Sequence, residues 1–201
     1  MMTNLEITRH ITIGYDAIQS RESLRALAAV MVCRKYKKGE RVLDEGEVCK
    51  CLRYIEKGML RQFYFKNGKE LTEHLAYEGN MVICLESYFR QTPSRLMIEA
   101  LEPTTLWEID KERVEELALT HADVGVWYRK VFEVSLIESQ VKADTLRFEP
   151  ANERYNTLMR LHPEIIKRVP LVYIAAYLQM TPETLSRVRS ASVKPSPSEA
   201  G

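Results

Sequence analysis

VPLVYIAAYLQMTPETLSRVRS, residues 169–190, is the stretch of sequence that decides the fold. From Leu171 to Leu178 the apolar residues recur at spacings of three and four, which places them on one face of a predicted helix. Residues 179–181 interrupt this face and predict a tight turn. Gln179 stands where the chain of such a turn often takes a positive φ, a conformation that costs free energy for residues other than glycine.

A start signal for a second helix follows the turn. Thr181 is a suitable N-cap, Pro182 fits the first helical position, and Glu183 suits the positive end of the helix dipole. Leu185 and Val188 lie three residues apart and face inward. The outer face then carries Glu183, Ser186, Arg187 and Ser190. This pattern predicts a DNA-reading helix-turn-helix, and an ordinary structural helical hairpin is the alternative.

The distribution of charge agrees with this interpretation. The 201 residues have a formal net charge of +1, and 45% of them are apolar, which is enough for a packed core. Residues 1–150 contain 22 Lys and Arg against 24 Asp and Glu, whereas residues 151–201 contain 7 against 4. The basic excess therefore lies with the predicted helix-turn-helix, as contacts with DNA phosphates require.

The sequence shows no secretory signal and no apolar run long enough to span a membrane, so we expect a cytoplasmic protein without a membrane partner. Its cysteines lack the paired spacing of a zinc site, and no metal site is predicted. We interpret them as buried or half-buried free thiols, with a redox or metal role for the Cys49/Cys51 pair left open. The four are Cys33, Cys49, Cys51 and Cys84.

Short strands separated by turns are predicted in the first half of the chain. A helix is expected over residues 16–31, and glycines then punctuate the sequence at intervals of 7 to 12 residues. Asn67-Gly68 is a strong hairpin signal, because both residues tolerate positive φ. The pattern favours a sandwich or barrel over a parallel α/β sheet. Strands are expected at residues 41–43, 52–56, 59–66, 69–76, 81–85, 97–101 and 104–109.

The second half of the chain is predicted to be helical, with helices at residues 111–120, 122–146 and 151–161. The long middle helix carries an apolar heptad seam with one polar interruption. A neighbouring face carries a second apolar stripe, so we expect one stripe to pack on the strands and the other to meet the same helix of a second chain. A helix fully buried in a monomer is the alternative. The seam consists of Val124, Trp127, Val131, Val134, Glu138 and Val141, and the second stripe of Tyr128, Phe132 and Leu136.

This order of elements, together with local motifs, resembles the Crp/Fnr family of bacterial transcription regulators. Residues 36–40, YKKGE, followed by Glu45-Gly46, are similar to the first turns of the family's cyclic-nucleotide-binding-type β-roll, and residues 55–61 to its next hairpin. Residues 173–175 and 181–187 are similar to its DNA-reading segment. The resemblance implies an α+β fold: an N-terminal double-stranded β-roll (jelly roll) with flanking helices, a long dimerisation helix and a C-terminal, winged-helix-like helix-turn-helix domain.

The resemblance also implies a division into domains. We expect a sensor roll at residues 1–120, a connecting dimerisation helix at 121–148 and a DNA-binding domain at 149–191. The Pro/Ser-rich residues 192–201 have the composition of a disordered tail.

By the same resemblance, Glu183, Ser186 and Arg187 occupy positions that touch base edges. A carboxylate accepts from the amino group of cytosine and an arginine pairs with guanine, so the chemistry agrees. An ion pair between Glu183 and Arg187, four residues apart, is the alternative use. Thr181 and Arg189 are expected at phosphates, and Pro182 completes the predicted set. The implied partners are a palindromic double-stranded DNA, a second copy of the chain and RNA polymerase.

Three features depart from the family pattern. The phosphate-binding segment, residues 79–100, lacks the Gly-Glu pair and the Arg-led run of members that bind cyclic nucleotides, so such a cofactor is disfavoured. Glu86, Ser87, Ser94 and Arg95 remain as an altered effector site. The N-terminal cysteine cluster of the iron–sulfur oxygen sensors is absent. Residues 191–201 also have no strand pattern for the wing hairpin.

A dimeric DNA-binding transcription regulator, controlled by an unidentified effector at the roll, is therefore the first functional hypothesis. The second is a cyclic-nucleotide-, small-molecule- or protein-binding module whose helix-turn-helix is only structural. An enzyme is not predicted, because the four histidines are scattered and no nucleophile motif, phosphate loop or metal spacing is present. His74 among Glu70, Glu73 and Glu78 is read as a set of solvated strand positions.

Overall fold

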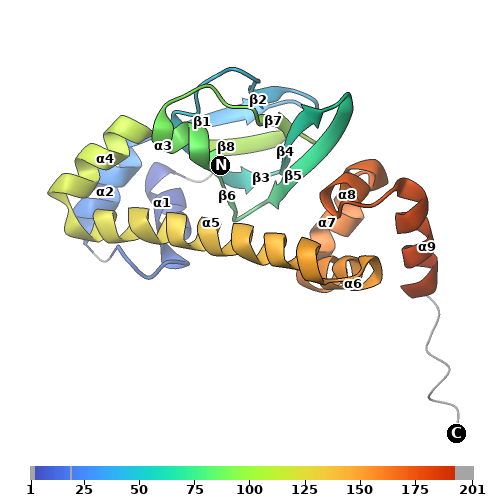
Figure 1. Cartoon of the computed structure of the whole chain (residues 1–201). Coiled ribbons are helices and arrows are strands. Elements are labelled where there is room, and N and C mark those ends of the chain that lie inside the picture. The colour runs from blue at the N-terminus through green and yellow to red at the C-terminus, as the bar shows by residue number, and fades with distance from the viewer. Residues whose placement is uncertain (1–2, 19, 193–201) are drawn as a thin grey trace, which may run out of the picture.

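The computed structural model describes residues 3–18 and 20–192. A strand-rich N-terminal half, a long helix running beneath it and a small group of C-terminal helices follow one another along the chain (Figure 1). This arrangement confirms the predicted α+β class. The expected disordered tail lies outside the described residues, apart from Ser192 at the end of the last helix.

Within the described ranges, eight strands form two antiparallel four-stranded sheets that face each other as a roll. The first sheet has the order β1 (Met31–Tyr36), β8 (Thr104–Asp110), β3 (Cys51–Lys57) and β6 (Met81–Val82). The second has the order β2 (Arg41–Leu43), β7 (Met97–Ala100), β4 (Met59–Lys66) and β5 (Lys69–Tyr77).

Residues with positive φ shape two turns of the roll. Asn67 and Gly68 have φ of 52° and 73°, which confirms the predicted hairpin between β4 and β5. Gly58 has φ of 106°, and a Cβ there would lie 2.4 Å from Oγ1 of Thr104. A side chain at Gly58 would therefore push the β3–β4 turn away from β8.

Helices close the open ends of the roll, and two of them differ from the prediction. The helix expected over residues 16–31 is the shorter α2 (Arg21–Val30), because Ser20 caps its N-terminal end and Met31 already pairs with Ile109 of β8. The strand expected over 81–85 ends at Val82, and α3 (Leu85–Arg90) follows. An additional helix, α1 (Asn4–Ile13), starts with a capping box between Thr3 and Glu6. The predicted α4 (Lys111–Thr120) is confirmed.

The long helix α5 (Ala122–Phe148) corrects the first half of the predicted seam. Val124, Trp127 and Val131 are fully buried in the core of their own roll, so they are not available to a second chain. The neighbouring stripe also packs within the chain: the rings of Tyr128 and Phe132 meet Tyr88 and Phe89 of α3. Only Leu136 at the end of that stripe is exposed.

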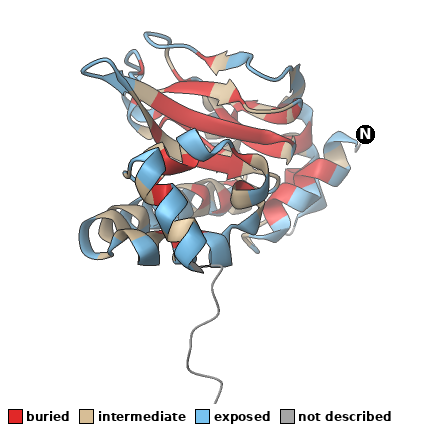
Figure 2. Cartoon of the chain, turned by 90° about the vertical axis from the view of Figure 1, so that its right-hand side faces the viewer, coloured by how far each residue is buried: buried red, intermediate tan, exposed pale blue. Residues whose placement is uncertain are grey.

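The C-terminal helices form a second, smaller core. They are α6 (Ala151–Leu161), α7 (Pro163–Arg168), α8 (Leu171–Tyr177) and α9 (Pro182–Ser192). Ile174, Ala175 and Leu185 are buried at the centre of this core, as the sequence pattern predicts. Met59 of β4 and Leu75 of β5 belong to the same cluster, so the helices also pack directly on the roll. Figure 2 shows the contrast between the red, buried strands and the mostly exposed surface of these helices.

Candidate functional site

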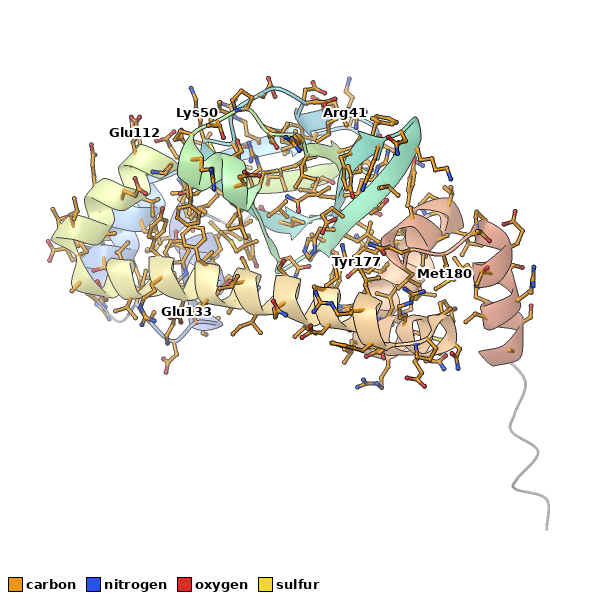
Figure 3. All side chains as sticks on the ribbon, viewed as in Figure 1. Arg41, Lys50, Glu112, Glu133, Tyr177 and Met180 are labelled. Atoms are coloured by element: carbon orange, nitrogen blue, oxygen red, sulfur yellow. The ribbon has the colours of Figure 1, made fainter. Side chains whose placement is uncertain are left out.

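The turn before α9 positions the predicted recognition helix. Gln179 has φ of 52°, which confirms the expected positive φ, and the Met180 N–H donates to the Ala175 carbonyl at 3.0 Å. The Thr184 N–H donates to Oγ1 of Thr181 at 3.2 Å, so Thr181 is the N-cap. Figure 3 labels Met180 at this turn, between α8 and α9.

The outer face of α9 is free for a partner. Glu183, Ser186 and Arg187 are exposed, whereas Leu185 is buried against the other C-terminal helices. Among the described residues no carboxylate lies within ion-pair distance of Arg187, so the alternative ion pair with Glu183 is not formed. A hydrogen bond from the backbone N–H of Glu183 and one from Thr181 lower the pKa of the Glu183 carboxyl, which is therefore ionised at neutral pH.

The remaining predicted DNA contacts lie around this face. Thr181 and Pro182 are exposed at the N-terminal end of α9, and Arg189 is half-buried. Arg189 points about 120° away from Glu183 around the helix, which suits a contact at the side of a groove better than one at its floor. The place of the wing falls on residues 193–201, outside the described residues.

A pocket of about 440 Å³ lies between the roll and α5, where the sequence predicted an altered effector site. Glu86 and Arg95 both line it, so the structure brings these two predicted residues together. Sequence reasoning missed the rest of the wall, most of which comes from β4, β5 and α5. It includes Gln62, Tyr64, Glu73, His74, Ser139 and Lys142.

The two predicted serines do not belong to this pocket. The buried Ser87 accepts a hydrogen bond from the Cys49 N–H at 2.9 Å and donates to the Thr92 carbonyl at 2.6 Å. The buried Ser94 donates to the Leu96 carbonyl at 2.8 Å and accepts from the Leu96 N–H at 3.0 Å. The Ser87 hydroxyl fastens α3 to the segments at Cys49 and Thr92, and the Ser94 hydroxyl holds its own loop, which corrects their assignment as effector ligands.

The electrostatics of the pocket fit a cyclic phosphate poorly. Glu73, Glu86 and Glu138 line it against two cations, Arg95 and Lys142. Nζ of Lys142 already contacts Oε1 of Glu73 at 3.1 Å. Burial, helped by the nearby charge of Lys142, lowers the pKa of His74 to about 4, so His74 is neutral at pH 7. Arg95 is therefore left as the only cation of the described wall that is free for an anion.

An ion cluster fastens the C-terminal helices to the roll. Arg168 at the end of α7 makes two hydrogen bonds to Glu78, at 2.7 and 2.9 Å, and a further contact with Glu102. Burial alone would raise the pKa of Glu78, but hydrogen bonds from Arg168 and from the Gly58 N–H outweigh it and lower the pKa to about 2. Because the cluster connects α7 to loops of both sheets, it fixes one orientation of the helix-turn-helix.

Aromatic contacts reinforce this junction. The guanidinium of Arg61 in β4 lies 3.8 Å from the centre of the Tyr173 ring in α8, and Nζ of Lys142 in α5 lies 4.8 Å from that of Tyr177. The hydroxyl of Tyr77 and Nδ1 of His162 are 3.1 Å apart. Figure 3 labels Tyr177 where the C-terminal helices face the roll and α5.

The second half of α5 exposes an apolar stripe. Val134 and Val141 of the predicted seam are 40% and 57% exposed, and Ile137 and Phe148 are 61% and 72% exposed. Spacings of 3, 4 and 7 residues place Val134, Ile137, Val141 and Phe148 on one face, which we call the distal seam. Glu138 of the predicted seam faces the pockets instead. Ile137 and Phe148 were missed because the sequence pattern alone did not reveal which side of α5 the roll covers.

Other site types find no support in the described part of the chain. All four cysteines are free thiols, with Cys49 and Cys84 buried and Cys33 and Cys51 half-buried, as predicted. In residues 3–18 and 20–192 no three His, Cys, Asp or Glu side chains come together to hold a metal ion. No helix of the described chain has the length and apolar character needed to cross a bilayer.

Comparison with known proteins identifies the roll. Residues 33–121 match the family model of the cyclic nucleotide-binding domain. A search of curated proteins by sequence found no match.

Solved structures match over both halves of the chain. FixK2 from Bradyrhizobium japonicum is 20% identical, with a TM-score of 0.68 over 81% of this chain and 84% of FixK2. The c-di-GMP-responsive global regulator CLP of Xanthomonas campestris is 19% identical, with a TM-score of 0.62 over 86% of this chain and 91% of CLP. The catabolite activator protein of Thermus thermophilus is 21% identical, with a TM-score of 0.53 over 86% and 83%. The predicted fold, a cyclic-nucleotide-binding-type roll with C-terminal helices as in Crp/Fnr regulators, is confirmed.

Proposed function

We propose that the chain is a DNA-binding transcription regulator of the Crp/Fnr type, which acts as a homodimer and reads a palindromic site through residues 182–190. In this proposal residues 1–120 sense an effector, residues 121–148 connect two copies, and residues 149–191 bind DNA. RNA polymerase is the protein partner that the family resemblance adds.

The observation that carries the proposal is the free outer face of α9. Glu183, Ser186 and Arg187 are exposed together on a helix whose other face is buried, and no carboxylate of the described chain pairs with Arg187. The guanidinium, the ionised carboxylate and the hydroxyl of this face supply donors and acceptors for base edges in the major groove.

The distal seam supports the homodimer. Four large apolar side chains at heptad spacing are exposed on a helix whose first half is already buried in the roll. Two such helices related by a two-fold axis would bury these stripes against each other. The same axis would present two recognition helices to two half-sites, which is why a palindromic operator follows from a dimer.

The pocket between the roll and α5 is the proposed effector site, with Glu86 and Arg95 at its wall. Its excess of carboxylates argues against a cyclic nucleotide, since a cyclic phosphate gains most from unpaired cations. We therefore propose a different small-molecule effector. Since α5 forms one side of the pocket and also carries the distal seam, an occupant would act on the spacing of the two DNA-binding units.

Selection of bound duplexes from a random library, followed by titration at several salt concentrations, tests the DNA-binding proposal. We expect one palindromic sequence to be enriched and the logarithm of its affinity to fall steeply with the logarithm of the salt concentration. Absence of binding even at low salt would overturn the proposal and favour the alternative, a ligand- or protein-binding module.

Arg187→Ala separates base reading from general attraction in the same assay. We expect the variant to lose about 1–3 kcal/mol on the selected site and to tolerate changes at one base pair. Equal losses on selected and random duplexes would show that Arg187 contacts phosphate instead. Lys167→Ala, on the exposed surface of α7, is the control for loss of one positive charge.

A further inference from the structure

A second cavity, of about 220 Å³, lies where α5 and β5 face the C-terminal helices α6, α7 and α8. Its wall is mostly apolar and comes from both sides of this junction, with Leu146 on α5 and Leu158 and Leu161 on α6. Ile137 and Val141 of the distal seam also line it, so the cavity borders the proposed dimer interface. The cavity shares His74, Glu138 and Lys142 with the pocket between the roll and α5, but its other lining residues are different. A body placed here would touch α5 and the DNA-binding helices at once.

One cation of this cavity is unsatisfied. Nε of Arg154, in the first turn of α6, is buried and has no hydrogen-bond partner, and no carboxylate of the described chain lies within 4.0 Å of the guanidinium. The other cations at the junction are paired, Lys142 with Glu73 and Arg168 with Glu78 and Glu102. A buried donor without a partner costs free energy that an incoming acceptor recovers.

The remaining polar groups leave this charge unbalanced at one end of the cavity. Burial lowers the pKa of both His74 and His162, so both imidazoles are neutral at pH 7. Glu138, the one carboxylate of the described lining, lies ten residues before the end of α5, about 15 Å along the helix axis. Arg154 lies after that end, on the helix that follows.

We propose that this cavity binds a small apolar carboxylate, whose hydrocarbon body lies against the aliphatic wall and whose carboxylate pairs with Arg154. A dry protein cavity of about 150 Å³ accepts benzene, so the larger volume here accommodates a medium-length alkyl chain or a ring with a short side chain. A guanidinium pairs with a carboxylate through two parallel hydrogen bonds, which gives the site its preference for this head group.

The occupant would couple to DNA binding through the walls it touches. Its body bridges α5 and β5 to the helices that carry α9, so it would stabilise one placement of the helix-turn-helix on the roll. This consequence rests on the proposed function, whereas binding of the carboxylate does not. The two are therefore tested separately.

Calorimetric titration of the full chain without DNA tests the site, with octanoate as the probe. Octanol supplies the same body without the charge, and acetate supplies the charge without the body. We expect one octanoate per chain and at least about tenfold weaker binding of octanol, the factor for one charge-assisted hydrogen bond. Acetate is expected to give no measurable heat of binding. Equal affinity for octanoate and octanol, or no octanoate binding, overturns the proposal.

A matched pair of variants assigns the binding to Arg154. Arg154→Gln keeps a polar side chain but removes the charge, and we expect it to weaken octanoate binding by about tenfold and to leave octanol unchanged. Arg160→Gln removes an exposed arginine of the same helix that does not line the cavity, and we expect no effect. Equal losses in both variants would overturn the assignment. A melting curve of each variant confirms that it is folded.

A cavity-filling variant tests whether the hydrocarbon chain of the ligand lies in the cavity. Leu161 is 51% exposed and lines the cavity, so Leu161→Trp fills space without opening the core. We expect it to abolish octanoate binding. If the side chains of a second copy fill the cavity instead, wild-type protein would bind octanoate only after dilution to monomer, and that result would overturn the proposal for the dimer. A change in DNA affinity on adding octanoate is measured last, so its absence affects only the coupling.

Discussion

The two halves of α5 carry the same kind of apolar pattern, but the roll covers this pattern only in the first half. In the first half, Val124, Trp127 and Val131 have no exposed surface, because the roll packs on them. In the second half, the distal seam residues are 40% to 72% exposed, because the roll no longer covers that face. The apolar pattern runs through both halves, with Glu138 as its one polar interruption. The difference teaches that a seam read from sequence identifies an apolar face but not the partner that covers it.

This division separates folding from assembly on a single helix. The first half stabilises the monomer, and we propose that the second half joins two monomers and so sets the distance between the two recognition helices. Four substitutions follow, from the largest expected effect to the smallest: two test the two halves of α5 directly, and two test the structure around them.

Trp127→Ala should damage the fold most. Its ring is fully buried and stacks edge-on against Tyr15 at a centroid distance of 6.5 Å, so the substitution leaves a large cavity. We expect a loss of about 3–5 kcal/mol in the free energy of unfolding, measured with urea at a concentration where the protein is monomeric. Val126→Ala, at a 39% exposed neighbouring position, should change it by less than about 0.5 kcal/mol. If both variants changed the free energy of unfolding by the same small amount, the first half of α5 would not stabilise the monomer as proposed.

Ile137→Glu should separate the dimer without unfolding the monomer. Two apolar side chains leave the interface for each substitution, because the symmetry repeats it, and we expect dimerisation to weaken by at least about a hundredfold. Sedimentation velocity measures the change.

Leu136→Glu is the matched control for that variant. It is 66% exposed on the neighbouring stripe of the same helix. A dimer that survives Ile137→Glu but not Leu136→Glu would place the interface on the stripe of Tyr128 and Phe132 instead.

Arg168→Gln should loosen the attachment of the C-terminal helices to the roll, which does not depend on either half of α5. Glu78 and Glu102 lose their shared cation, and we expect a loss of about 1–2 kcal/mol in the free energy of unfolding. Lys167→Gln removes a 66% exposed neighbour that pairs only within α7, and should be near neutral. Equal stability of the two variants would show that hydrophobic packing alone holds the junction.

His74→Gln should change the pH dependence of stability beneath the second half of α5. Burial lowers the folded pKa of His74 to about 4 from an ordinary value of 6.5, so the unfolded chain binds the proton first. In the wild type, the contribution of neutral His74 to the free energy of unfolding is therefore complete above pH 6.5 and is lost as the pH falls toward 4. We expect a flatter stability profile for the variant in this window. Protonation of Glu78, whose pKa is lowered to about 2, reduces the free energy of unfolding below about pH 4.5, and this reduction should remain in both proteins. Unchanged slopes between pH 6.5 and 4 would contradict the burial of His74.

Much of the fold could be predicted from local signals. The hairpin at Asn67-Gly68 and the N-cap at Thr181 depend on the backbone of a few residues, and both are confirmed. The capping box of α1 was equally local, and it was missed although Thr3 and Glu6 have the required spacing. The end of β6 could not be predicted, because Ile83 to Leu85 is apolar in either state and contacts elsewhere decide between strand and helix.

The candidate site was predictable where one helix contains it and not where several elements meet. The face of α9 follows from helical periodicity, so Glu183, Ser186 and Arg187 were found together. The pocket wall combines several strands with α3 and α5, and positions 69 residues apart, such as Glu73 and Lys142, meet only after folding. Ser87 and Ser94 were misassigned because the backbone partner of a hydroxyl leaves no pattern in the sequence.

The most direct test of the central claim compares two duplexes, one with the full selected site and one with a single half-site, at one salt concentration. We predict that the wild type binds the full site at least about a hundredfold more tightly than the half-site, since a dimer engages both halves. Ile137→Glu should lose this preference and bind the half-site as the wild type does. If the wild type shows no preference, or the variant keeps it, the proposed division of α5 is contradicted.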